Sequence, residues 1–134
     1  MPSLWEAVYT SALREDAPEG TIAAIVRTAR RHNQLNGITG ILVFDGQLFC
    51  QYLEGAPQVV QSLLQRIAAD RRHRDFTLHH EGALRQRRFE SWSMAYGLDG
   101  EGVIARLQRL PGQVIPAALF DALLQLDLEP GLAI

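Results

Sequence analysis

Residues 38–53 read ITGILVFDGQLFCQYL, and this stretch decides the fold. Its two halves, 38–44 and 47–53, are rich in the β-branched, aromatic and other apolar residues that are typical of strands. Asp45-Gly46 joins them, and this dipeptide readily adopts the positive-φ conformations of a tight turn. The stretch therefore predicts an antiparallel β-hairpin.

The residues before the hairpin predict a strand and a helix. Leu4–Ser11 mixes aromatic and β-branched residues and precedes a breaker cluster at 16–20, as a strand would. From Thr21, the expected N-cap, to a stop at Asn36-Gly37, the pattern favours a helix. Its apolar residues recur at helical spacing, at Ile22, Ile25, Val26 and Ala29. Its far side carries Arg27, Arg30 and Arg31, which we expect to be a solvated face.

The residues after the hairpin predict a second helix and two more strands. Pro57 suits the first turn of a helix, and its apolar stripe is Val60, Leu63, Leu64 and Ile67. Residues 76–82 and 89–98 favour strands, and the basic stretch 85–88 between them is expected to be a solvated loop.

The order of these elements is strand, helix, strand, strand, helix, strand, strand. This order is typical of an α+β fold with a ferredoxin-like mixed sheet and its two helices on one face. The other face then needs a cover, which we expect from C-terminal helices. Their apolar stripes are Val103, Ile104 and Leu107, followed by Ala117, Leu119, Phe120, Leu123 and Leu124.

Composition excludes several classes of function. The 134 residues carry a net charge of -2, so we expect neither a nucleic-acid nor a membrane partner. The start of the chain resembles no signal peptide, and a cytoplasmic location is expected. Cys50 is the only cysteine, which excludes an intrachain disulfide and a cysteine-based zinc site.

Gln51 is the first candidate functional residue. Strand alternation places it with Phe49 and Leu53 on one face, and Cys50 and Tyr52 on the other, so both faces are apolar and Gln51 should be buried. An unsatisfied buried amide costs about 1–3 kcal/mol, so it needs a polar partner. That partner could be backbone, a neighbouring side chain or a ligand. The Tyr9 hydroxyl needs one too if its ring faces the helices.

Several short motifs together resemble the BLUF family of blue-light sensors. They are Val8-Tyr9-Thr10-Ser11, Asn33 before Asn36-Gly37-Ile38-Thr39-Gly40, Gln51-Tyr52-Leu53-Glu54-Gly55, Asp70 with Arg72-His73, and Phe89 with Trp92-Ser93-Met94. Each motif alone is weak, but their joint order and spacing over residues 4–97 is specific. The resemblance implies a sensor domain over residues 1–98 and a C-terminal helical extension over 99–134.

The resemblance implies a non-covalent flavin between the two helices, FAD first, with FMN or riboflavin as alternatives. The implied cofactor-binding residues are Tyr9, Ile25, His32, Asn33, Gln51, Arg66, Ile67, Asp70 and His73. Several also have a plain structural interpretation: Ile25 and Ile67 as core, His32 as an exposed helix end, Asn33 as a helix cap. Arg66 and Asp70 could equally be a surface pair one helical turn apart.

The resemblance also implies a mechanism. Blue light would draw an electron and a proton from Tyr9, and the amide of Gln51 would rotate or tautomerise, which shifts the flavin spectrum to the red. Trp92 and Met94 match positions that relay the change, or they are simply packed beside the sheet. We expect no enzymatic activity, an intermolecular output to a signalling partner, and a homo-oligomer.

Two other functions remain open. The first is a light-insensitive protein-interaction domain that keeps the motif positions. The second is a small ferredoxin-like hydrolase such as an acylphosphatase, which needs an arginine in an anion-binding loop before the first helix. Residues 16–20 contain two acids and no arginine, so this reading is disfavoured.

Overall fold

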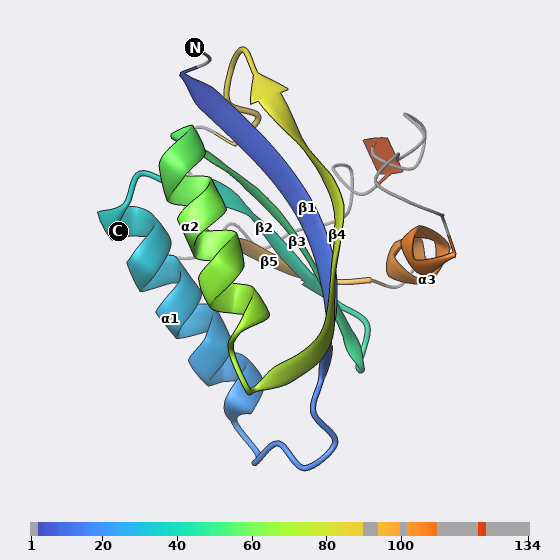
Figure 1. Ribbon diagram of the computed structural model, residues 1–134. Helices are drawn as coiled ribbons and strands as arrows, with labels where there is room; N and C mark the ends of the chain where they lie inside the picture. The colour runs from blue at the N-terminus through green and yellow to red at the C-terminus, as the bar shows by residue number, and fades with distance from the viewer. Residues whose placement is uncertain (1–2, 90–93, 100–101, 110–120, 123–134) are drawn as a thin grey trace.

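The computed structural model describes residues 3–89, 94–99, 102–109 and 121–122 (Figure 1). Its strands are β1 (Leu4–Leu13), β2 (Thr39–Phe44), β3 (Leu48–Gly55), β4 (His73–Leu84) and β5 (Ala95–Leu98). Its helices are α1 (Thr21–Leu35), α2 (Pro57–Ala68) and α3 (Val103–Gln108). This order confirms the predicted α+β class, and within the described residues no helix has the length and apolar character needed to cross a bilayer.

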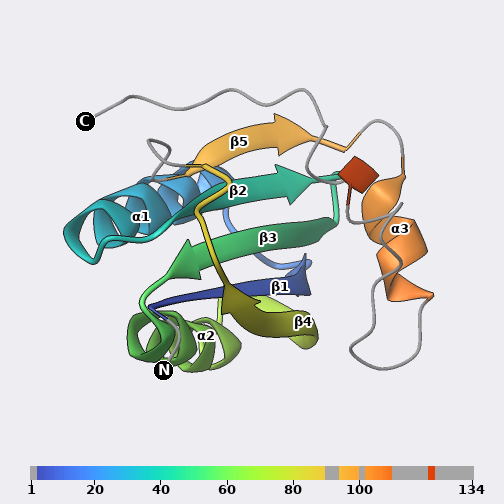
Figure 2. The ribbon, with the colours of Figure 1, turned by 90° about the horizontal axis from the view of Figure 1, so that it is seen from above.

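The strands form one mixed sheet in the order β4-β1-β3-β2-β5. All neighbouring strands are antiparallel except β2 and β5, which are parallel. Helices α1 and α2 lie side by side over one face of the sheet, whereas α3 lies on the other side (Figures 1 and 2). The β1–β3 pairing is central, and it places Tyr9 directly opposite Gln51.

The hairpin forms where the sequence predicts it. Gly46 adopts a φ of 106°, and the Asp45 carboxylate accepts hydrogen bonds from the backbone N–H groups of Gln47 (2.9 Å) and Leu48 (2.7 Å). The aspartate thus stabilises the turn through its side chain while the glycine supplies the left-handed backbone. This local chemistry fixes the register of β2 against β3.

Each face of the sheet buries its own apolar core. The core under α1 and α2 includes Phe49 and Leu53 of β3, and the core under α3 includes Cys50 and Tyr52. This division confirms the alternation predicted for β3. Val103, Ile104 and Leu107 of α3 are fully buried, as the first C-terminal stripe predicts. The second stripe, Ala117, Leu119, Phe120, Leu123 and Leu124, lies outside the described residues.

Gly40 of β2 leaves no room for a side chain against β3. It pairs with Leu53, and a Cβ atom at this position would collide with the main-chain carbonyl of Tyr52. Because that neighbour is backbone, it cannot move aside as a flexible side chain would. Glycine is therefore required here for space.

Several expectations about element ends were wrong. β5 begins at Ala95 rather than at Phe89, and β1 continues to Leu13 rather than ending at Ser11. Thr21 is the first residue of α1 rather than its N-cap; Gly20 holds the cap position with φ of 87°, and the Thr21 hydroxyl donates to the Pro18 carbonyl. β4 begins at His73, not at Phe76, because its pairing with β1 contains two register shifts. A pattern of strict alternation does not predict a strand that contains bulges.

Candidate functional site

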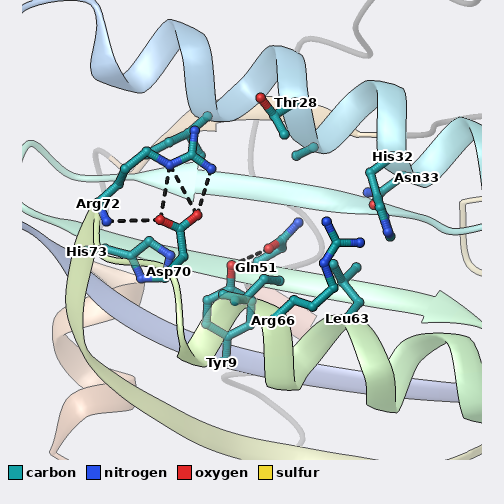
Figure 3. Close-up of a pocket in the computed structure, with 13 residues that line it drawn as sticks. Tyr9, Thr28, His32, Asn33, Gln51, Leu63, Arg66, Asp70, Arg72 and His73 are labelled. Carbon is teal, nitrogen blue, oxygen red and sulfur yellow. Dashed lines mark hydrogen bonds and ion pairs between the residues drawn. The ribbon is translucent and has the colours of Figure 1, made fainter.

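A cleft of about 600 Å³, counted with its open mouth, lies between α1 and α2 above the centre of the sheet (Figure 3). All nine of the expected cofactor-binding residues line it: Tyr9, Ile25, His32, Asn33, Gln51, Arg66, Ile67, Asp70 and His73. Thr28, Ala29, Leu63 and Arg72 also line it and were not predicted. Helical spacing could have found the first three, since each lies three or four residues from a predicted neighbour.

Tyr9 and Gln51 meet at the floor of the cleft. Both side chains are buried, and the Tyr9 phenol donates a hydrogen bond to Oε1 of Gln51. The Tyr9 ring also stacks on Phe76 of β4, with ring centroids 4.9 Å apart. Burial raises the pKa of the phenol far above its ordinary value, and nearby Cys50 and Asp70 add to the effect. The predicted need of the buried amide for a polar partner is thus met by the tyrosine.

The other end of the Gln51 amide faces Met94. Nε2 donates to the Met94 sulfur at 3.5 Å, and Met94 is fully buried just before β5. The Met94 carbonyl accepts a hydrogen bond from Nε of Arg30 at 3.1 Å. The expectation that Arg30 belongs to a solvated face was therefore wrong, because this side chain is partly buried. Trp92 lies outside the described residues.

His32 and Asn33 line one end of the cleft from the last turn of α1 (Figure 3). The capping role considered for Asn33 falls instead to Asn36, whose Nδ2 donates to the His32 carbonyl at 2.7 Å. Asn33 itself is only 1% exposed. His32 is half-buried rather than exposed, and among the described residues its buried Nδ1 has no hydrogen-bond partner.

Asp70, Arg72 and His73 line the opposite end of the cleft (Figure 3). The Asp70 carboxylate pairs with the Arg72 guanidinium at 2.6 Å, and these hydrogen bonds lower the pKa of Asp70. The alternative pairing of Asp70 with Arg66 was therefore wrong. Arg66 instead extends from α2 into the cleft, so both cations contribute positive charge to its walls.

The cleft has the chemistry that a flat, partly polar ring requires. Ile25 and Ile67 supply apolar walls from opposite helices, and the buried amides of Asn33 and Gln51 supply donors and acceptors. Such a combination of apolar walls and a few placed polar groups is typical of cofactor sites. The unpartnered Nδ1 of His32 fits as well, because a buried polar atom is normally satisfied. The residues present therefore fit a flavin.

A second polar cluster lies on the opposite face of the sheet, around the fully buried Glu54. Its carboxylate accepts hydrogen bonds from the hydroxyls of Tyr52 (2.9 Å) and Thr39 (2.6 Å) and from the backbone N–H groups of Arg88 (2.8 Å) and Phe89 (3.0 Å). We call this set the Glu54 cluster. Arg87 adds bonds to the Thr39 hydroxyl and the Gly37 carbonyl, so the basic stretch was wrongly expected to be solvated throughout.

The fold and cleft define a small α+β domain with a site for a flat cofactor between two helices. The chain belongs to the BLUF family, described as sensors of blue-light using FAD, whose family model matches residues 4–95. FAD is therefore the cofactor of its family.

Relatives and solved structures agree. The blue light- and temperature-regulated antirepressor BluF of Escherichia coli (strain K12) is 39% identical over 66 residues, 49% of this chain and 16% of that protein. The beta subunit of the photoactivated adenylate cyclase of Euglena gracilis is 42% identical over 93 residues, 69% of this chain and 11% of that protein. The chain thus corresponds to a small part of either relative.

The dark-state structure of the BLUF protein BlrB superimposes on the chain with a TM-score of 0.70 at 34% identity. The match covers 83% of this chain and 86% of that one. The predicted family and fold class are both confirmed.

Proposed function

We propose that this domain senses blue light with an FAD held between α1 and α2, and that Tyr9 and Gln51 are its photoactive pair. The observation that carries the proposal is the buried hydrogen bond from the Tyr9 phenol to Gln51 Oε1 at the floor of the cleft. Ile25 and Ile67 would contact the faces of the ring, and Asn33, His32 and Arg66 its polar edge. Asp70 and His73 would lie toward the other end.

Bound there, the flavin would supply blue-light absorption and an acceptor for one electron. Tyr9 would be the donor, and its proton must leave with the electron because burial raises the pKa of the phenol. Gln51 Oε1 is the acceptor already in place for the phenolic hydrogen. Rotation of the amide would exchange its donor and acceptor ends, since the amide oxygen accepts and the amide nitrogen donates.

The rotated amide would present Nε2 to Tyr9 and Oε1 to Met94. The present bond from Nε2 to the Met94 sulfur would then be lost, because a carbonyl oxygen and a thioether are both acceptors. Met94 directly precedes β5, so the change at Gln51 would reach β5 through this contact. Trp92 is the other proposed relay.

We further propose that residues 1–98 form the sensor unit and 99–134 an extension that takes part in output. The match of the family model to residues 4–95 and the burial of α3 on the far face of the sheet support this division. Relatives include an antirepressor and a cyclase subunit of which the chain matches only a small part, which supports control of an effector rather than catalysis by the domain. A homo-oligomer in the cytoplasm is part of the same proposal.

The test is the absorption spectrum of the purified protein in darkness and after blue light. We expect a yellow protein, release of all flavin by acid or heat, and a small red shift on illumination. Gln51→Leu nearly conserves volume, so it should keep the flavin and lose the shift. A colourless protein that takes up no added flavin would overturn the proposal and favour a light-insensitive interaction domain.

A further inference from the structure

Arg30 of α1 is hydrogen-bonded to Met94, the residue that precedes β5. Among the described side chains of α1, it alone makes a hydrogen bond to Met94. Its Nε donates to the Met94 carbonyl at 3.1 Å, while the Met94 sulfur accepts from Gln51 at 3.5 Å. Met94 is therefore held at two points, its backbone by α1 and its side chain by the switch amide.

The two contacts differ in strength. A thioether is a weak acceptor, so the Gln51 bond alone contributes little to the position of Met94. A hydrogen bond from a charged guanidinium to a carbonyl is about twice as strong as a neutral one. The regular pairing of β5 with β2 begins one residue later, at Ala95 opposite Ile41. Arg30 is thus the stronger of the two restraints.

The neighbouring arginines do not share this role. Arg27 and Arg31 lie on the same helix and are exposed, whereas Arg30 is partly buried. The same helix lines the cleft three residues further on with Asn33. One rigid element therefore contacts both the cofactor cleft and the backbone of Met94.

We propose that Arg30 is a positioning residue of the light switch: by holding the Met94 carbonyl, it keeps the thioether against the Gln51 amide and so favours the dark orientation of that amide. This inference rests on the proposed function. If it holds, loss of Arg30 leaves flavin binding intact but weakens the arrangement to which the amide must return after light. Recovery in darkness should then slow by about twofold, because the contact that is loosened is the weak hydrogen bond from Gln51 to the Met94 sulfur.

The chain offers matched variants. Arg30→Gln removes the charge and shortens the side chain so that it no longer reaches Met94. Arg27→Gln and Arg31→Gln remove the same charge from exposed positions of the same helix. Arg30→Lys keeps a cationic donor of similar length, so Met94 and the rate of dark recovery should stay close to those of the native protein. This variant also gives a second test of the position if Arg30→Gln fails to fold.

The position of Met94 can be measured without any photochemistry. The chain has two methionines, Met1 and Met94, so a ¹³C-methyl methionine NMR spectrum contains one signal from the switch region. In the dark, flavin-bound protein, Arg30→Gln should shift the Met94 methyl signal. Arg27→Gln and Arg31→Gln should leave it in place, and Arg30→Lys should return it toward the native position.

Dark-recovery kinetics after a blue flash complete the test in the same variants. Slower recovery together with a displaced Met94 signal in Arg30→Gln alone supports the inference. An unmoved signal, or recovery that is unchanged or faster, overturns it. If the native protein itself shows no red shift, the proposed function fails, and the NMR spectra still report separately whether Arg30 holds Met94.

Discussion

Tyr9 and Gln51 lie directly opposite each other on β1 and β3, and the phenol of one donates a hydrogen bond to the amide oxygen of the other. The amide nitrogen of Gln51 bonds to Met94. Each end of one side chain is thus held by a different part of the fold. A rotation of the amide must change both contacts at once.

Tyr9→Phe should bind flavin and lose the light-induced red shift, because phenylalanine has no phenolic proton to release. The ring still stacks on Phe76, so the site should keep its shape. Tyr96→Phe is the control, since this tyrosine lies in β5 and does not line the cleft. Light-minus-dark absorption spectra measure the effect. A normal shift in Tyr9→Phe would place the electron donor elsewhere.

Asn33→Ala should weaken flavin binding by about tenfold, the effect of losing about 1.4 kcal/mol of hydrogen bonding. Asn33 is buried in the cleft wall, whereas Asn36 lies one turn beyond and caps α1. Asn36→Ala therefore removes the same group from the same helix end without touching the cleft. Titration of the apoprotein with FAD, followed by fluorescence, gives both dissociation constants. Equal affinities for the two variants would refute the role of Asn33.

Glu54→Gln should lower the free energy of unfolding by about 2–3 kcal/mol, because one of the two oxygens becomes a donor and leaves buried donors unpaired. The donors at risk are those of the Glu54 cluster. Exposed Glu19→Gln should change stability by less than about 0.5 kcal/mol. Urea denaturation of both variants decides the matter. If Glu54→Gln lowers the free energy of unfolding as little as Glu19→Gln does, the Glu54 cluster must rearrange to satisfy the new amide.

The stability of the domain should fall as the pH drops below about 6.5, the ordinary pKa of histidine. Burial lowers the pKa of His79, and of His73, in the folded chain. As the pH falls, these histidines bind protons more readily in the unfolded chain than in the folded chain, which favours unfolding. The contribution is fully present above that ordinary pKa.

His79→Gln should make this pH dependence shallower. Glutamine does not titrate but can still bond to the Thr10 hydroxyl, which His79 contacts at 2.6 Å. Urea denaturation between pH 7.5 and pH 5 measures the slope. A residual slope from His73 is expected. An unchanged slope would show that His79 does not titrate in this range in either state.

Blue light should speed amide hydrogen exchange in α3. Gln108 of α3 donates a hydrogen bond to the Thr10 hydroxyl of β1 at 2.9 Å. Thr10 directly follows Tyr9 in the chain and lies on the opposite face of the sheet, so a change at Tyr9 has a direct route to α3. Hydrogen exchange in darkness and under light, read over residues 100–134, tests this route. Identical protection and an unchanged oligomer size by scattering would exclude it even if the photocycle is normal.

The fold was predictable where local chemistry decides it. Asp45-Gly46 specified the hairpin, and alternation along β3 correctly divided its residues between two cores. Most of the lining of the cleft was predicted, from the family motifs that carry Tyr9, Asn33 and Gln51 and from the apolar stripes of α1 and α2. These patterns involve residues that are close in the sequence, so they can be recognised in a single sequence.

Other features depend on partners distant in the chain. The sequence pattern did not distinguish Arg30 from the exposed Arg27 and Arg31. Its hydrogen-bond partner, the Met94 carbonyl, is distant in the chain and leaves no sign in the sequence of the helix. The stretch around Arg87 looked like a solvated loop, although its bonds run to Thr39 and Gly37. The bulges of β4 also escaped prediction, since they appear only when the strand is paired with β1.

The close approach at Gly40 limits how this receptor can be altered. Gly40 of β2 lies against the carbonyl of Tyr52 in β3. The same stretch of β3 carries Gln51 on one face of the sheet and Glu54 on the other. Any larger residue would displace the backbone beneath both the Gln51 amide and the buried Glu54 carboxylate. Efforts to tune the colour or speed of the receptor can vary the walls of the cleft, but this position offers no mutational freedom.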